Sequence, residues 1–145
     1  MDSARQIENL IYRYAELIDA GDLAGVAALF ANGEIISTEH DARFTGESEV
    51  LDLYKMSCRL YEDTGTPKTK HLTTNVIIDV KGDTAQARSY YTVVQATESL
   101  PMQPIISGRY HDTFRSRAGN WEFASREMFV DLQGDCSAHL LYELQ

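Results

Sequence analysis

The sequence is short of the residues and patterns that define several common protein classes. Only two of its 145 residues are cysteine and three are proline. Cys58 and Cys136 stand too far apart to predict a disulfide framework or a thiolate metal site. No apolar run approaches the roughly 20 residues that span a bilayer, and the polar N-terminus lacks a signal-peptide pattern. We therefore expect a soluble, cytoplasmic protein with free thiols and no membrane association.

Basic residues are also scarce. The chain has 13 Lys and Arg against 22 Asp and Glu, which gives a net charge of −9. Because nucleic-acid phosphates need a basic footprint, this balance argues against nucleic acid as a partner. Hydrophobic residues at 43% and charged residues at 24% are ordinary values for a globular protein. The length fits a single domain over residues 1–145.

Motifs that bind cofactors are missing from the sequence. It has no glycine-rich phosphate loop, no nucleophile-elbow motif around a serine and no closely spaced cysteine pair. His40, His111 and His139 show no metal-ligand spacing with Cys, Asp or Glu. We expect neither a metal nor a cofactor.

The N-terminal part of the chain has helical periodicity. Apolar residues recur at helical spacing behind Ser3 and Gln6, which have the spacing of a capping box. Gly21 is a natural left-handed stop for this helix. Asp22 then predicts the cap of a second, shorter helix that continues to Phe30.

The next segment predicts a small hairpin and a third helix. Short alternating stretches surround Ile35 and Phe44, as expected for two paired strands. The third helix is expected from about 47 to 61. A loop rich in Thr, Gly, Pro and Lys follows over 62–70.

From His71 onward the period changes from helical to alternating. The apolar side of the first strand contains Leu72, Thr74, Val76, Ile78 and Val80. Three further strands follow, over about 84–97, 105–117 and 120–132. The chain thus begins with helices and continues with consecutive antiparallel strands. This order predicts an α+β fold, with three helices packed on one face of a bent sheet.

Two residues are candidates for proton-transfer chemistry. Asp19 falls in the last turn of the first helix, where the helix dipole disfavours a carboxylate. It is either a pocket carboxylate that orients a base or a surface residue beside Gly21. His71 shares a strand face with Thr73 and Asn75, and histidine is the natural proton carrier near neutral pH. That polar face either lines a pocket or meets solvent, and in the second case His71 is structural.

Arg126 shares a strand face with apolar residues, where a guanidinium needs a partner or a ligand. If the last hairpin closes through a three-residue loop, 118–120, Asp112 lies opposite Arg126 and the two form a cross-strand ion pair. A two-residue loop would shift the register and remove that pairing. The sequence leaves the two interpretations, ion pair and ligand contact, equally open.

The order of these features resembles the SnoaL-like domains of the nuclear-transport-factor-like superfamily. The resemblance rests on these segments together: Ile11-Tyr12-Arg13-Tyr14-Ala15 through Asp19-Ala20-Gly21-Asp22, Leu29-Phe30, Lys70-His71-Leu72-Thr73-Thr74-Asn75, Gly108-Arg109-Tyr110-His111-Asp112 and Gly119-Asn120-Trp121-Glu122-Phe123. It covers nearly the whole chain. It implies a cone-shaped α+β barrel, with a strongly curved and mostly antiparallel sheet around an internal pocket.

Within that superfamily the chain resembles the branch that contains scytalone dehydratase and hexachlorocyclohexane dehydrochlorinase. Those enzymes use a His–Asp dyad without a cofactor, and the resemblance implies His71 and Asp19 as that dyad and Arg126 as a further active-site residue. The chain departs from this branch at three points, one of which is that the dehydratase's additional strand histidine has no clear match around residues 107–110. Tyr14 falls near the dehydrochlorinase's lysine, and Ile18 stands where the dehydratase has a tyrosine beside its Asp.

These inferences lead to a hypothesis: a cofactor-independent lyase or isomerase that acts on a small apolar or polycyclic substrate. His71 would remove a proton, Asp19 would hold the imidazole, and Arg126 or tyrosines would stabilise negative charge. Four further residues are expected to bind the substrate: Tyr14, Tyr54, Tyr110 and Met128. The alternative is a non-catalytic module, either a small-ligand carrier or an assembly subunit like the dioxygenase β-subunits.

The C-terminal segment 137–144 is apolar enough to pack on a neighbouring copy or to close the pocket. Together with the resemblance, it predicts a homodimer or a homotrimer. A scaffold dimer with a filled interior is a third possibility.

Overall fold

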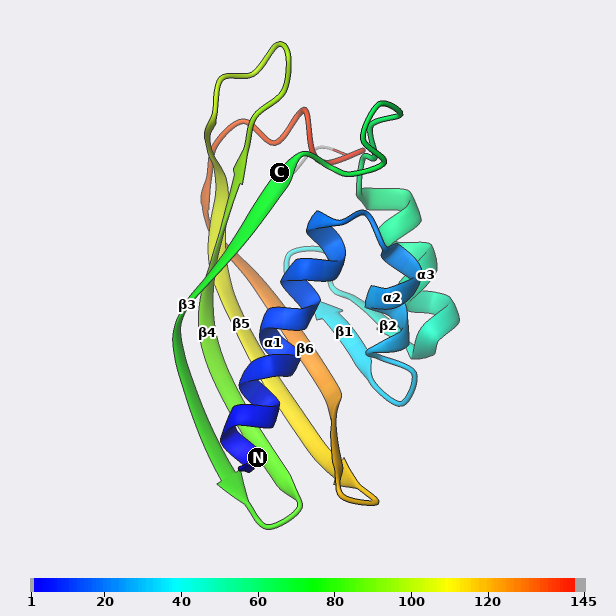
Figure 1. Cartoon of the computed structure of the whole chain (residues 1–145), viewed down its shortest axis with the longest axis vertical. Helices are drawn as coiled ribbons and strands as arrows, with labels where there is room; N and C mark the ends of the chain where they lie inside the picture. The colour runs from blue at the N-terminus through cyan, green and yellow to red at the C-terminus, as the bar shows by residue number, and fades with distance from the viewer. Residues whose placement is uncertain (1, 143–145) are drawn as a thin grey trace.

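The computed structural model describes residues 2–142, in which three helices lie on one face of a curved sheet (Figure 1). Helix α1 (Ser3–Asp19) crosses the long strands and packs on the first of them. Helices α2 (Leu23–Ala28) and α3 (Gly46–Ser57) pack against each other at the other end of the sheet. The predicted α+β architecture is confirmed.

The helix ends follow local chemistry, with two differences from expectation. The N-cap of α1 is Asp2, whose side chain accepts from Arg5 N–H at 2.8 Å, so the capping box predicted at Ser3 is wrong. Gly21 ends this region at a φ of +78°, and Asp22 caps α2 as predicted. Helix α2 ends at Ala28, before Phe30, and α3 ends at Ser57 rather than near residue 61. The reason at α3 is that Cys58 is extended and pairs with Leu140.

Within the described residues, six strands form one sheet in the order β2-β1-β6-β5-β4-β3. Their bounds are β1 Glu34–Ser37, β2 Ala42–Thr45, β3 Thr69–Lys81, β4 Thr84–Gln95, β5 Gln103–Arg117 and β6 Asn120–Gln133. Strand β1 runs parallel to β6, and the other pairs are antiparallel. Because β2 and β3 lie at opposite edges and do not pair, the sheet is open, and the cone-shaped barrel that the resemblance implies is not closed.

A bulge in β3 decides which side chains face the helices. The pairing of β3 with β4 shifts register between Thr74 and Ile77, and Asn75 lies there at a φ of +53°. Leu72 is 47% exposed, so the expectation that it faces the core with Val76 is wrong. Before the bulge the odd-numbered residues face inward, and after it the even-numbered ones do. The bulge therefore places His71 on the helix-covered face of the sheet.

The hairpin of β5 and β6 reaches the expected register by an unexpected route. Its loop has two residues, Ala118 and Gly119, with φ values of +52° and +83°, so the three-residue loop on which the ion pair was made to depend is not present. The register of β5 against β6 then shifts between Thr113 and Phe114, and this bulge restores the pairing of Asp112 with Arg126. One bulge thus compensates for the shorter loop.

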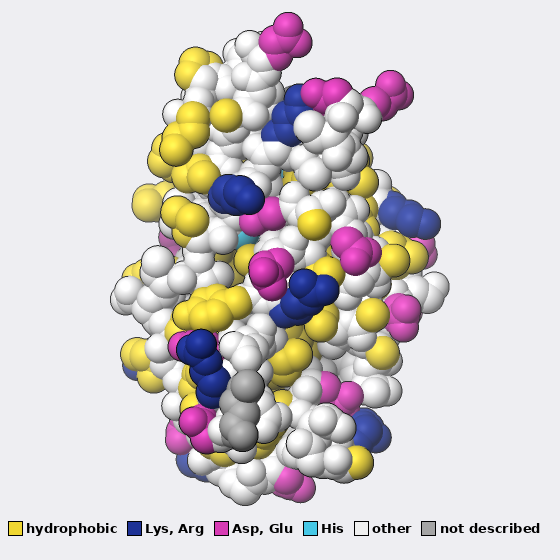
Figure 2. Space-filling view, viewed as in Figure 1, with side chains coloured by type: hydrophobic (Ala, Val, Ile, Leu, Met, Phe, Trp, Pro, Cys, Tyr) yellow, Lys and Arg dark blue, Asp and Glu magenta, His cyan; other side chains and the backbone are white. Residues whose placement is uncertain are grey.

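The core lies between the helices and the concave face of the sheet. Its fully buried side chains include Ile7, Ile11, Val26, Phe30, Ile35, Val50, Ile105 and Phe123. Acidic and basic side chains are scattered over the face shown in Figure 2 and form no single charged patch there. Among residues 2–142, no helix is long and apolar enough to cross a membrane.

Candidate active site

Asp19 and His71 are in direct contact where α1 crosses the start of β3. The ring Nδ1–H of His71 donates to Asp19 Oδ1 at 2.7 Å, and the backbone N–H of His71 donates to Oδ2 at 2.8 Å. Thr69 adds a third hydrogen bond through its hydroxyl at 2.9 Å. Both side chains are largely buried, at 8% exposure for His71 and 11% for Asp19. The structure thus brings together the two residues that the sequence singled out.

The charge of Asp19 is favoured by these contacts. Burial acts to raise the pKa of this carboxyl, but the hydrogen bonds and charge interaction with His71, and the Thr69 hydroxyl, outweigh it, so the pKa lies below its ordinary value. A carboxylate that accepts from Nδ1 fixes the tautomer of a neutral imidazole. The other nitrogen of His71, Nε2, is then the one available to a ligand.

A cavity of about 140 Å³ lies beside this pair, between α1, α3 and the sheet. His71 lines it. All four residues predicted to bind a substrate line it as well: Tyr14, Tyr54, Tyr110 and Met128. An apolar cavity of roughly 150 Å³ is enough to hold benzene. The volume therefore suits a molecule the size of one ring.

Tyrosines make one wall of the cavity. The hydroxyls of Tyr14 and Tyr54 are hydrogen-bonded to each other, and the ring of Tyr110 packs edge-on against Tyr14 and stacks on Tyr91. Burial raises the pKa of Tyr14 and of Tyr54 well above the ordinary value, so both hydroxyls stay protonated. Two hydroxyls carry two protons, and their mutual hydrogen bond uses one. The second proton is available for a bound molecule.

Arg126 is paired with Asp112 and sits behind the tyrosines. Its Nε and Nη2 donate to the two carboxylate oxygens at 2.8 and 2.9 Å, and both side chains are fully buried. Burial acts to lower the pKa of Arg126, but the charge of Asp112 and its hydrogen bonds raise it above the ordinary value, so Arg126 remains a cation. The guanidinium carbon lies 3.7 Å from the ring centre of Tyr110 and 4.3 Å from that of Tyr14. Of the two interpretations left open by the sequence, the structure shows the ion pair.

No sequence pattern connected His139 with this site. Its side chain is 7% exposed, it lines the cavity, and its ring centre lies 6.1 Å from that of His71. Glu39 and His40 also line the cavity and were not expected there. Both lie in the turn between β1 and β2, which has no periodic or motif signal for a site. Within residues 2–142, no group of three or more His, Cys, Asp or Glu is placed to hold a metal ion.

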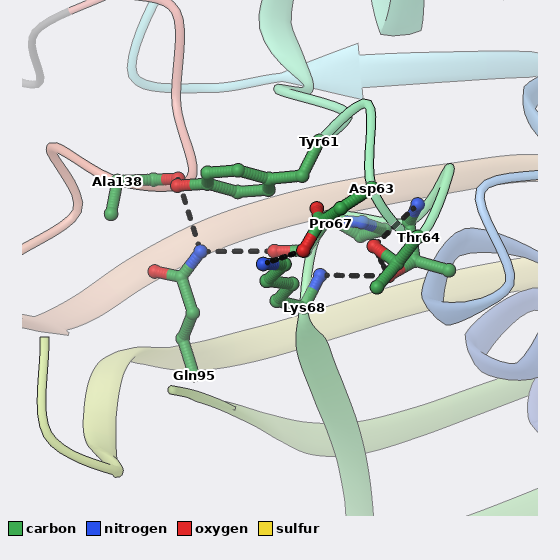
Figure 3. A network of polar contacts seen from close by, with 8 residues as sticks. Tyr61, Asp63, Thr64, Pro67, Lys68, Gln95 and Ala138 are labelled. Atoms are coloured by element: carbon green, nitrogen blue, oxygen red, sulfur yellow. Dashed lines mark hydrogen bonds and ion pairs between the residues drawn. The ribbon is translucent and has the colours of Figure 1, made fainter. Parts of the chain in front are cut away.

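The segment after β6 covers the cavity and brings His139 into it. Figure 3 shows how it is anchored: the Gln95 amide donates to the carbonyls of Pro67 and Ala138, both at 3.0 Å. The Tyr61 hydroxyl donates to the same Ala138 carbonyl at 2.6 Å. Leu140 and Tyr142 complete this side of the cavity wall. Residues 143 and 144 of the expected closing segment lie outside the described residues.

The fold and the cavity define an α+β protein of the nuclear-transport-factor-like and cystatin-like class. Residues 1–127 match the family model described as the SnoaL-like domain, and the chain belongs to that family. No curated protein sequence matches the chain.

Solved structures with the same fold agree with this assignment. An NTF2-like protein with a cystatin-like fold from Novosphingobium aromaticivorans is 24% identical, with a TM-score of 0.74 over 93% of this chain and 85% of that one. A protein of the same organism, provisionally named a scytalone dehydratase, is 26% identical, with a TM-score of 0.72 over 91% and 86%. LinA is 18% identical, with a TM-score of 0.69 over 90% and 86%, which shows a shared fold.

Proposed function

We propose that this protein is a cofactor-independent lyase or isomerase that removes a proton from a small, largely apolar substrate. The observation that carries the proposal is the hydrogen-bonded pair of Asp19 and His71 at the wall of a ring-sized cavity. The volume favours a single ring over the polycyclic substrate also considered from the sequence. The similarity to a protein provisionally named a scytalone dehydratase supports chemistry of the lyase kind.

In the proposed reaction, Nε2 of His71 takes a proton from a carbon next to a carbonyl group. The electron pair of the broken C–H bond moves toward the carbonyl oxygen and gives an enolate. The imidazolium of His71 is stabilised by the Asp19 carboxylate. The proton then returns to another carbon, which is an isomerisation, or it leaves with a β-hydroxyl group as water, which is a dehydration.

Negative charge on the enolate oxygen needs stabilisation, and the tyrosine wall offers it. The free proton of the Tyr14 and Tyr54 pair can donate to that oxygen, as in an oxyanion hole. Arg126 supports this stabilisation indirectly, because its positive charge faces the rings of Tyr14 and Tyr110. We therefore assign Arg126 a supporting role through these tyrosines and no direct contact with the substrate.

Two ring ketones test the proposal. Cyclohex-3-enone is converted to cyclohex-2-enone by isomerisation, and 3-hydroxycyclohexanone gives the same product by dehydration, so ultraviolet absorbance follows both. We expect the wild-type protein to accelerate at least one reaction and His71→Asn to lose about 10²–10⁴-fold of that acceleration while remaining folded by circular dichroism. Equal rates in the two proteins, or no acceleration by either, would contradict the proposal.

A non-catalytic ligand carrier is the second candidate. One observation favours it: Asp19 also ties α1 to β3 through Thr69 and the His71 backbone, a role that needs no chemistry. A carrier would bind cyclohexanone in the cavity but leave both ketone reactions at their uncatalysed rates.

A homodimer or homotrimer is part of the proposal. Leu72, Ile77 and Tyr90 are exposed on the outer face of neighbouring strands β3 and β4, where a second copy could cover them. Light scattering on the eluting protein should give two or three times the monomer mass. A single-copy mass would remove this part of the proposal and leave the site unaffected.

A further inference from the structure

We propose that His139 is a second polar contact for the substrate, and that its imidazole N–H donates to the carbonyl oxygen of the ring that His71 deprotonates. The inference rests on the function proposed above and narrows it. It makes the substrate class a neutral, single-ring carbonyl compound, and it makes the C-terminal segment part of the binding site.

The backbone around His139 holds the ring in place. Its carbonyl accepts from Arg59 N–H at 2.9 Å, and the next residue, Leu140, pairs with Cys58 at the end of α3. The N–H of Leu141 donates to Ser57 at 3.0 Å. Together with the Gln95 amide on the Ala138 carbonyl (Figure 3), these bonds fix the segment on both sides of the imidazole. A ring held this firmly can contribute to binding without a further loss of side-chain freedom.

One nitrogen of the His139 imidazole lacks a hydrogen bond within the described residues. Nδ1 of His139 is buried and has no hydrogen-bond partner among the described residues, although its ring lines the cavity. Buried polar atoms are nearly always paired, because a buried donor or acceptor without a partner costs free energy. A carbonyl oxygen that comes within hydrogen-bond distance of Nδ1 would accept from it in its protonated form.

The charges around the cavity favour a neutral ligand. Burial and the nearby His71 lower the pKa of His139 to about 4, so it is neutral at pH 7. Glu39 lines the cavity, Asp19 lies behind His71, and no Lys or Arg is among the described residues that line it. A carboxylate or phosphate would find no cation to pair with. A ketone needs only a hydrogen-bond donor.

The spacing of the two histidines fits one carbonyl unit. The bonds of a C–C=O group, about 1.5 and 1.2 Å, place the α-carbon and the oxygen about 2.4 Å apart. A base approaches the carbon to about 3–3.5 Å, and a donor approaches the oxygen to about 2.9 Å. Because the base, the α-carbon, the oxygen and the donor need not lie on a straight line, these lengths are compatible with the 6.1 Å between the ring centres of His71 and His139.

Binding of two probes of matched shape tests the inference. Cyclohexanone and methylenecyclohexane differ only by an oxygen in place of a CH₂ group. The quantity measured is the ratio of their dissociation constants, obtained by titration with ligand-detected NMR. We expect His139→Phe to reduce the preference for cyclohexanone about fivefold to tenfold. His139→Gln keeps a donor and should stay within about twofold of wild type. The control His111→Phe, on the outer face of the sheet, should leave the ratio unchanged.

A measurement on the wild-type protein does not depend on whether these variants fold. Cyclohexanone should shift the protonated ring nitrogen of His139 in the ¹⁵N spectrum, and methylenecyclohexane should not. An unchanged ratio in His139→Phe, or identical ¹⁵N responses to both probes, overturns the inference. His71→Asn separates the two proposals: it should keep the wild-type ratio whether or not the protein is a catalyst.

Discussion

Both oxygens of the Asp19 carboxylate accept hydrogen bonds from His71. Oδ1 accepts from the ring Nδ1–H, and Oδ2 accepts from the backbone N–H. This double contact sets both the position and the tautomer of the imidazole. Because the two residues come from the end of α1 and the start of β3, the contact also fixes where the helix crosses the sheet.

Asp19→Asn is expected to reduce turnover of the ring ketones by about 10²–10⁴-fold. An amide cannot accept at both of its terminal atoms, so either the ring Nδ1–H or the backbone N–H of His71 loses its acceptor. Steady-state kinetics measures the loss, and ¹⁵N spectra of His71 report the tautomer. Thr69→Val removes only one of the three hydrogen bonds to Asp19 and should stay within about tenfold of wild type. An Asp19→Asn rate close to wild type would count against the role of this carboxylate.

Arg126→Met is expected to lower the free energy of unfolding by about 3–5 kcal/mol, because it leaves Asp112 charged and buried without its partner. Urea denaturation followed by Trp121 fluorescence measures the change. Arg126→Met combined with Asp112→Leu should recover much of the loss, since no unpaired charge remains. Arg117→Met, at an exposed ion pair with Glu122, provides the control and should cost no more than about 1 kcal/mol. A double variant as unstable as the sum of both single changes would contradict this view of the pair.

We expect the free energy of unfolding to fall at acid pH because of the buried imidazole of His139. The pKa of His139 is about 4 in the folded protein and about 6.5 in the unfolded chain, so the unfolded chain binds the proton more readily. This contribution is complete above about pH 6.5 and is lost as the pH falls toward 4, which amounts to about 3 kcal/mol. Denaturant titrations at several pH values should show a smaller acid loss in His139→Gln than in wild type. His111→Gln, which is exposed, should follow the wild-type curve, and parallel curves for all three proteins would refute the assignment.

Ala118→Asn is expected to raise stability by about 1 kcal/mol and the melting temperature by about 3 °C. Alanine is strained at the φ of +52° that this turn imposes, whereas Asn followed by Gly suits a turn with two left-handed residues. Thermal denaturation by circular dichroism measures the shift. Gly119→Ala, in the same turn at a φ of +83°, should have the opposite effect. Destabilisation by Ala118→Asn would show that the turn does not carry this strain.

Much of the fold follows from the periodicity of the sequence, but the inward face of each strand does not. The helices, the small hairpin and the long strands were predictable, because they depend on local spacing and turn residues. Strand parity alone assigned Leu72 to the core, and the bulge at Asn75 reverses that assignment. No local pattern marks this bulge, since asparagine in a strand is also compatible with regular pairing.

The candidate site was also predictable only where it depends on the order and spacing of residues. The contact of Asp19 with His71 was expected from a resemblance in order and spacing, and the structure shows the two side chains together. The pairing of Asp112 with Arg126 was left open, because it depended on the length of the hairpin loop and no local pattern predicts the bulge that restores it with a two-residue loop. His139 was missed, since its place depends on the long-range pairing of Leu140 with Cys58, which leaves no trace in the local sequence.

The bulge in β3 also affects how the molecule behaves beside other molecules. Strand β3 is a long edge strand, and an uninterrupted edge is a template for adding further strands. The displaced residues at Asn75 break that edge midway, and Lys70, Asp79 and Lys81 place charge along it. The chain therefore carries His71 on an edge strand whose bulge and charged side chains oppose the addition of further strands.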